Sequence, residues 1–296
     1  MIESVTSRKF AFIQLFTLHM QPELFRIGPV PVYSFGLMMA IAFLSANALL
    51  TREMQRRWKD SEKAAAFSST ITLIALLAGI AGSKMFHIAE NPELLVRNGV
   101  SEIFSGSGLT FFGGLLTAIA CIAVYVKRKR IAFLFLADVT APGLILAYGI
   151  GRIGCQLAGD GDYGIPSSLP WAMSYPKGTV PTLSALNPEL ASKWMEMHPG
   201  LPVPVDITVH PTPVYETLAC FLIFYLLYRM QQRVPALREG RVFGWYLLAA
   251  GVERFLVEFL RLNPLYLGLS QAQWISVGLS VAGLVLLART NKQPIR

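Results

Sequence analysis

Several long stretches of this sequence contain no charged residue and consist almost entirely of apolar side chains. An apolar stretch of about 18 residues or more is long enough to cross the hydrocarbon core of a bilayer, which is about 30 Å thick. The chain is 53% hydrophobic and only 15% charged, which is too little charge for a surface that faces water on every side. We therefore expect an all-α polytopic membrane protein. A soluble enzyme, a disulfide-rich secreted domain and a disordered chain are excluded.

The apolar pattern predicts about seven transmembrane helices, over residues 32–51, 65–88, 109–126, 131–151, 212–229, 242–262 and 272–288. Most of the Lys and Arg residues lie in four of the segments outside them, 52–63, 127–130, 229–241 and the C-terminal tail. Basic residues are retained in the cytoplasm. This charge pattern predicts that the N-terminus lies outside and the C-terminus in the cytoplasm.

The segment 155–209 contains only two Lys residues and many prolines and aromatic side chains, so we expect an outward-facing head region there. Residues 1–19 combine a basic pair with a short apolar run and no small-residue cleavage site. They are interpreted as a misassigned start or a loose N-terminal extension. Residues 20–296 then form a single transmembrane domain that contains the head as an insertion.

Charged side chains inside the predicted sixth helix are costly to bury and mark a functional site by default. Arg254 and Glu258 are four residues apart and Glu258 is three residues from Arg261, so all three share one helical face. A buried ion pair that fixes helix packing is the alternative interpretation for Glu258. It explains Arg254 less well, because one carboxylate cannot satisfy two guanidinium groups.

Arg152 lies in a glycine-rich stretch at the outer end of the predicted fourth helix. Gly151 and Gly154 allow a ligand to approach the backbone closely, and a guanidinium group matches the oxygens of a phosphate. Together with Arg254, this pattern predicts a phospholipid headgroup site in the outer half of the bilayer. The alternative is an arginine that extends to the membrane surface.

Other motifs carry weaker signals. Asp160 and Asp162 have the spacing of a metal loop but lack further oxygen ligands, so we expect a turn and no metal. Gly113 and Gly114 are typical of close helix packing. His210 opens the predicted fifth helix and is a candidate base. No zinc-ligand spacing or nucleic-acid-binding pattern occurs, and the three cysteines are too far apart to indicate a disulfide framework.

Taken together, five motifs in consistent order resemble those of the bacterial prolipoprotein diacylglyceryl transferases. They are Tyr33-Ser-Phe-Gly-Leu37, Gly108-Leu-Thr-Phe-Phe-Gly-Gly-Leu115, Asp138-Val-Thr-Ala-Pro142 followed by Gly151-Arg-Ile-Gly154, His210-Pro-Thr-Pro-Val-Tyr-Glu216 and Arg254-Phe-Leu-Val-Glu-Phe-Leu-Arg261. The resemblance implies transfer of the diacylglyceryl group of phosphatidylglycerol to the lipobox cysteine thiol of a preprolipoprotein, the first step of lipoprotein maturation. Glycerol-1-phosphate is the expected leaving group.

The resemblance also implies roles for individual residues. Arg152 and Arg254 correspond to essential arginines, Tyr33 lies in the lipid cavity, Asp160 stands where the family usually has Glu, and Glu258 keeps its place. We expect catalysis by the field of the two arginines, with Asp160 or Glu258 holding one of them and His210 as the reserve base. The complete prediction names as catalytic Arg152, Arg254, Tyr33 and His210, and as substrate-binding Arg152, Gly151, Gly154, Asp160, Gly113, Gly114, Glu258 and Arg261.

The expected partners are phosphatidylglycerol, preprolipoprotein signal peptides with a lipobox cysteine, and the lipid bilayer. We expect a multi-pass monomer in the bacterial inner membrane, with a periplasmic head, without a cofactor and without nucleic acid. Two departures from the family pattern leave alternatives open: Phe112 stands where a histidine is frequent, and Cys155 stands where an asparagine is frequent. The rivals are a catalytically diverged lipid-binding paralogue and a small-molecule transporter, although we see no paired repeats of the kind that transporters contain.

Overall fold

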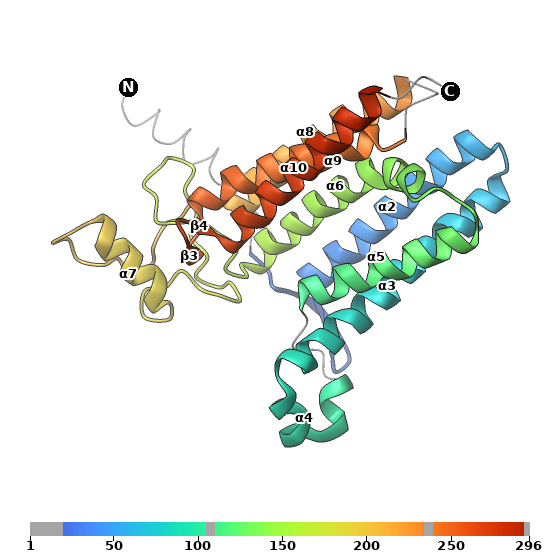
Figure 1. Cartoon of the computed structure of the whole chain (residues 1–296). Coiled ribbons are helices and arrows are strands. Elements are labelled where there is room, and N and C mark those ends of the chain that lie inside the picture. Colours follow the sequence, from blue (N-terminus) through green and yellow to red (C-terminus); the bar gives the residue numbers. More distant parts are fainter. Residues whose placement is uncertain (1–19, 105–109, 234–238, 293–296) are drawn as a thin grey trace. The chain divides into compact units, whose positions relative to one another are not determined.

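The computed structural model describes residues 20–104, 110–233 and 239–292 of the 296-residue chain. The described chain is mostly helical, as expected (Figure 1). It divides into a first unit, Met1–Ala46 with Ala141–Arg296, and a second unit, Asn47–Thr140. The N-terminal extension predicted over residues 1–19 lies outside the described residues.

Nine α-helices, two 3₁₀ helices and four short strands follow one another along the described chain. They are β1 (Glu23–Ile27), β2 (Val30–Tyr33), α2 (Ser34–Trp58), α3 (Ser61–Glu90), α4 (Pro92–Asn98), the 3₁₀ helix η1 (Gly99–Phe104), α5 (Phe111–Arg128), α6 (Phe133–Ala158), α7 (Pro188–Met197), α8 (Thr212–Arg233), α9 (Arg241–Val257), the 3₁₀ helix η2 (Glu258–Leu260), β3 (Leu265–Tyr266), β4 (Leu269–Ser270) and α10 (Gln271–Lys292). The strands pair as two antiparallel hairpins, β1 with β2 and β3 with β4.

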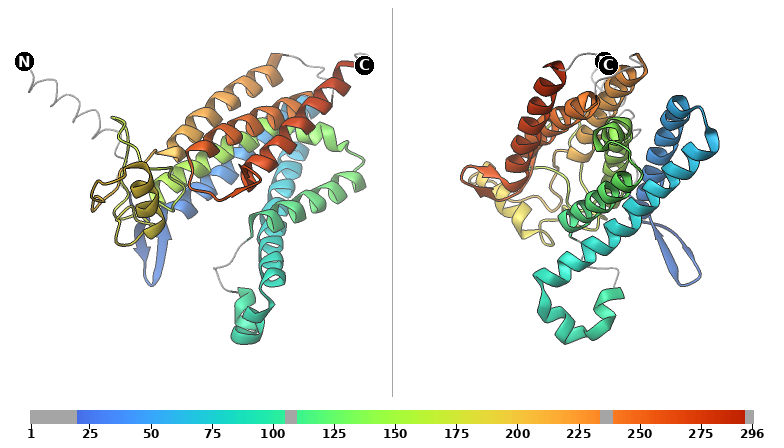
Figure 2. Two further views of the ribbon diagram at one scale, coloured as in Figure 1. Left: turned by 60° about the vertical axis from the view of Figure 1, so that its left-hand side comes forward. Right: turned by 45° about the vertical axis from the view of Figure 1, so that its right-hand side comes forward.

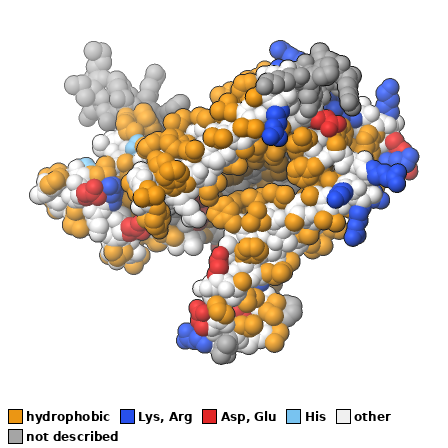
Figure 3. Space-filling model, viewed as in Figure 1, with side chains coloured by type: hydrophobic (Ala, Val, Ile, Leu, Met, Phe, Trp, Pro, Cys, Tyr) orange, Lys and Arg blue, Asp and Glu red, His pale blue; other side chains and the backbone are white. Residues whose placement is uncertain are grey.

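Five of the described helices are long and apolar enough to cross a membrane: α2, α3, α5, α6 and α10. They coincide with five of the seven predicted spans. Helices α8 and α9 occupy the other two predicted ranges, but α9 has only 17 residues and α8 carries polar residues in its first turns. Hydrophobic side chains cover most of the visible face of the long helices (Figure 3), as expected for helices whose surroundings are lipid.

In the second unit, glycines allow α3 and α5 to pack in close contact. A Cβ atom on Gly113 would lie 2.4 Å from the Cβ of Phe86, and one on Gly114 would lie 2.3 Å from the Oγ of Ser83. Real side chains do not approach so closely, so only glycine fits at these positions. The prediction that Gly113 and Gly114 serve helix packing is therefore confirmed.

The second unit also contains Lys84, whose ammonium group lies 3.0 Å from a carboxylate oxygen of Glu102. Both side chains are buried. A buried charge is tolerated when it is paired, so this pair accounts for the cation inside the second predicted span.

In the first unit, α9 and α10 pack in the same way, and Figure 2 shows them side by side in both views. A Cβ atom on Gly251 would lie 2.4 Å from the Oγ of Ser280, and one on Gly283 would lie 2.7 Å from the carbonyl oxygen of Gly244. Helices α6, α8 and α9 share an apolar core around Ile145. These contacts fix the three helices that carry the polar cluster described below.

The segment between α6 and α8 forms a compact head in the first unit. Tyr163 and Tyr175 stack with ring centroids 5.0 Å apart, and both belong to a buried cluster with Leu190, Ile207 and Val209. The head lies at the end of the unit where α6 ends and α8 begins, whereas Arg233 and other basic residues lie at the far end of α8. The head and Arg233 thus lie at opposite ends of α8.

Candidate active site

Arg152 lies inside α6, because the helix continues to Ala158 instead of ending at residue 151 as predicted. Its Nε lies 2.7 Å from the Oε2 of Glu216, and its Nη2 donates a hydrogen bond of 2.8 Å to the hydroxyl oxygen of Tyr148. Its Nη1 donates to the carboxylate of Asp162 in the head. The guanidinium group therefore joins α6 to both α8 and the head.

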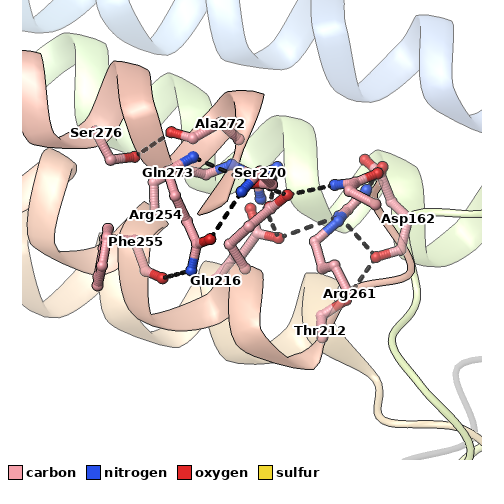
Figure 4. Close-up of polar contacts among 12 residues, drawn as sticks. Asp162, Thr212, Glu216, Arg254, Phe255, Arg261, Ser270, Ala272, Gln273 and Ser276 are labelled. Carbon is pink, nitrogen blue, oxygen red and sulfur yellow. Dashed lines mark hydrogen bonds and ion pairs between the residues drawn. The ribbon is translucent and has the colours of Figure 1, made fainter. Parts of the chain in front are cut away.

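Glu216, one turn into α8, is the centre of the cluster and is fully buried. Its Oε2 pairs with Arg152 and accepts a hydrogen bond of 2.7 Å from the hydroxyl of Tyr148. Its Oε1 lies 3.4 Å from the Nη1 of Arg254 and 3.5 Å from the Nη1 of Arg261. Figure 4 shows Arg254 and Arg261 on either side of this carboxylate. Three guanidinium groups from two helices and the chain beyond α9 thus converge on one buried carboxylate.

Arg254 is held by a second carboxylate as well, that of Glu258. The Nη2 of Arg254 lies 2.8 Å from the Oε2 of Glu258, which is the contact expected from their spacing on one helical face. Glu258 is itself fixed, because its Oε1 accepts hydrogen bonds from the Nδ2 of Asn263 at 2.5 Å and from the Oγ of Ser270 at 2.8 Å. Arg254 is therefore positioned by a carboxylate that cannot easily turn away.

Asp162 is the counterpart of Glu258 for the other two arginines. Its carboxylate pairs with Arg152 and Arg261, and its backbone carbonyl accepts a hydrogen bond of 2.8 Å from the Nη1 of Arg261. Burial alone would raise the pKa of Asp162, but the charges of the two guanidinium groups outweigh it and lower the pKa to about 2. Of the two acids predicted to hold an arginine, Glu258 pairs with Arg254, whereas Arg152 and Arg261 pair with Asp162 and not with the predicted Asp160.

Asp160 lies beside this pair without contacting an arginine. Burial and the negative charge of Asp162 raise its pKa. Potential ligand atoms of Cys155, Asp160 and Asp162 lie within 4.8 Å of one another, so their geometry alone would suit a small cation. However, Arg152 and Arg261 already engage the carboxylate of Asp162, and their positive charge opposes a second cation there.

The charges of the cluster balance. Arg152, Arg254 and Arg261 face Asp162, Glu216 and Glu258. Arg254 is the most accessible of the three arginines, with 22% of its side chain exposed, against 14% for Arg152 and 9% for Arg261. A phosphate group needs such an accessible planar fork of donors. Arg254 is therefore the arginine best placed to meet an entering anion.

The remaining predicted site residues lie at varied distances from this cluster. Gly154 packs against α2, because a Cβ there would lie 3.1 Å from the Cβ of Met38, whereas at Gly151 the nearest atom is 3.8 Å away. Tyr33, at the end of β2, is 54% exposed. Gly113 and Gly114 belong to the second unit.

His210 precedes α8 and lies beside Tyr215, with the two ring centroids 6.2 Å apart. Its Nδ1 is 3.4 Å from the hydroxyl oxygen of Tyr215, which also accepts a hydrogen bond of 2.7 Å from the Nε1 of Trp171. Burial lowers the pKa of His210, so the neutral imidazole is favoured near neutral pH. None of the described ion pairs joins His210 to the arginines.

Reasoning from the sequence missed both Tyr148 and the central role of Glu216. Tyr148 and Glu216 are 68 residues apart, and Arg254 and Glu216 are 38 apart, so no local pattern joins them. One signal was available: three arginines in apolar surroundings require three carboxylates.

The sequence matches the family described as prolipoprotein diacylglyceryl transferase over residues 22–289. It is 29% identical to the phosphatidylglycerol–prolipoprotein diacylglyceryl transferase of Clostridium tetani, over 93% of this chain and 100% of that protein. It is 31% identical to the protein of the same name from Idiomarina loihiensis, over 92% and 94% of the two chains. For the Bordetella parapertussis protein of that name, the identity is 29% over 93% and 97%. The matched range includes the whole arginine cluster.

Proposed function

Because the chain belongs to the prolipoprotein diacylglyceryl transferase family, we propose that its arginine cluster is where the diacylglyceryl group of phosphatidylglycerol passes to a prolipoprotein. The chain is a transferase of lipoprotein biosynthesis with several membrane helices. The observation that supports this site is the convergence of Arg152, Arg254 and Arg261 on the buried Glu216. Such a preorganised set of donors suits a phosphate in a dry environment.

Arg254 binds the lipid phosphate first, because it is the most accessible of the three guanidinium groups. Arg152 is less exposed than Arg254 and supplies further positive charge to the site. Tyr148, Glu216 and Asp162 hold its guanidinium group in orientation. As the sulfur of the acceptor cysteine attacks the glycerol carbon, the bond between that carbon and the phosphate oxygen breaks. Negative charge then grows on the departing glycerol phosphate, where the arginines stabilise it.

The acceptor is the lipobox cysteine of a preprolipoprotein signal peptide. A cysteine thiol has an ordinary pKa of about 8.5, so about a few per cent is already ionised at neutral pH. The positive field of the cluster increases the ionised fraction of a thiol that approaches it. Tyr33, Gly151 and Gly154 are assigned to lipid positioning, Asp160 to support of the loop beside Asp162, and His210 to the reserve base.

The proposed topology has seven membrane helices, with α8 and α9 added to the five that are long and apolar enough. The head over 155–209 faces the periplasm, and the basic ends of the helices and the C-terminus face the cytoplasm of a bacterial inner membrane. Residues 20–296 form one monomeric transferase domain. Cysteine labelling from each side of a sealed vesicle tests this orientation.

A second candidate is a lipid-binding paralogue without turnover, which is favoured by Phe112 and Cys155 at positions where the family frequently has other residues. The two functions differ in a transfer assay in detergent with phosphatidylglycerol and a lipobox peptide, in which release of glycerol phosphate is followed. We expect release that requires the peptide cysteine and that is lost in Arg152→Ala and Arg254→Ala. Lipid binding without release would establish the paralogue instead.

A further inference from the structure

One buried carboxylate near the cluster has no arginine partner. Glu253 lies on α9 next to Arg254 in sequence, and only 7% of its surface is exposed. Its Oε1 has no hydrogen-bond partner among the described residues. Glu216 and Glu258, in contrast, both pair with arginines. Burying a carboxylate oxygen without a partner is unfavourable, so a ligand that brings a hydrogen-bond donor would be stabilised at Glu253.

Glu253 lines an apolar groove of about 490 Å³ between α8 and α9. The small side chains of Ala219 and Ala249 lie on its two walls, and Glu253 is the one charged residue in its lining. Trp245 lies toward the basic end of α9, and eight residues of helix, about 12 Å, separate it from Glu253. An extended apolar path thus leads along the two helices to a single carboxylate.

Glu253 also lies within electrostatic reach of the arginine cluster. Its charge interacts with those of Glu216 on α8, Arg254 on α9 and Arg152 on α6. Because Glu253 lies next to Arg254 in α9, a group bound at Glu253 is subject to the positive field of the cluster.

We propose that Glu253 accepts the proton of the acceptor thiol, and that the groove between α8 and α9 holds the apolar segment of the signal peptide that carries it. This inference rests on the proposed function. An acyl chain would also suit the apolar lining, but it offers Glu253 no hydrogen-bond donor. The peptide offers both an apolar segment and a thiol.

The proton and electron balance of the step is complete. The carboxylate of Glu253 takes the proton of the S–H group, and the resulting thiolate forms a bond from sulfur to the glycerol carbon. The bond from that carbon to the phosphate oxygen breaks, and its electron pair stays on the phosphate. The departing glycerol phosphate then takes the proton from Glu253. No oxidant, reductant or metal is required.

The test compares two peptides that differ in one atom, with the acceptor cysteine in one and selenocysteine in the other. A selenol is ionised at neutral pH, so it needs no base. We expect Glu253→Gln, which has the size of the native side chain, to lower kcat/KM for the cysteine peptide by about 100-fold or more. For the selenocysteine peptide, the loss should be within about threefold, since proton transfer is no longer part of the step. Glu189→Gln, on the exposed face of α7, is the matched control and should behave as wild type.

Each result separates the alternatives. Equal losses with both peptides would show that Glu253 has a structural role and would overturn the proposal. A loss confined to the KM for phosphatidylglycerol would show that the groove binds lipid, with the same consequence. Absence of transfer by the wild-type protein with either peptide would instead refute the proposed function itself.

Discussion

Replacement of Glu216 by glutamine tests the role of the central carboxylate in the cluster. The substitution keeps the shape of the side chain but removes the charge that pairs with Arg152 at 2.7 Å and lies 3.4 and 3.5 Å from Arg254 and Arg261. Three guanidinium groups would then face only Asp162 and Glu258. Removing one partner of a buried ion pair costs about 3–5 kcal/mol, because the remaining charge is uncompensated.

The size of the effect makes it measurable by thermal unfolding in detergent. For a chain of this size, each kcal/mol lowers Tm by about 2–4 °C, so Glu216→Gln should lower Tm by about 10 °C. Glu216→Asp keeps the charge and should lose less, and the exposed Glu189→Gln should not change Tm. Transfer should fall in parallel for Glu216→Gln because Arg152 loses its orientation. A Tm within about 2 °C of wild type, with normal transfer, would refute the central role of Glu216.

Two further predictions concern Asp162 and the helix pair α3 and α5. The folded-state pKa of Asp162, about 2, lies below its ordinary value, so its ion pairs stabilise the fold above about pH 4 and are lost as the pH falls toward 2. Asp162→Asn should therefore lower Tm by a constant amount between about pH 5 and 8, and the Tm difference from wild type should shrink in more acidic solution. A Tm difference that stays constant down to acidic pH would contradict this prediction. Gly113→Leu should destabilise the second unit, because a Cβ atom at this position would lie 2.4 Å from the Cβ of Phe86. Limited proteolysis should therefore cut the variant faster than wild type. Resistance equal to that of wild type would refute the close packing of α3 and α5.

The helices were predictable because apolar length is a local property of the sequence. The five helices that are long enough begin near their predicted first residues, but α2 and α6 each continue for seven residues beyond their predicted ends at 51 and 151. In α6, the last two turns pack against the head and α2, so polar residues such as Arg152 and Gln156 are accommodated there. Hydropathy detects the apolar part of a helix that faces lipid, but it does not detect further turns of the same helix that are buried by other parts of the protein.

The arginines of the candidate site were predictable for a related reason, since a cation inside an apolar run is costly and conspicuous. Their partners were less so. Glu258 could be assigned to Arg254 from helical spacing, but the choice between Asp160 and Asp162 depends on a turn in which Gly161 has φ of +90°. The role of Glu216 could not be predicted, because it depends on α6, α8 and α9 meeting at one point. No local sequence pattern contains that information.

Replacement of Arg254 by lysine gives the most direct test of the claim that the arginine cluster grips the lipid phosphate during transfer. Arg254→Lys retains the positive charge but removes the planar fork that can grip a phosphate with two parallel hydrogen bonds. Release of glycerol phosphate and binding of phosphatidylglycerol should be measured together for wild type and this variant. We predict that the lysine variant still binds the lipid but transfers about 100-fold more slowly or worse. Turnover equal to that of wild type would contradict it.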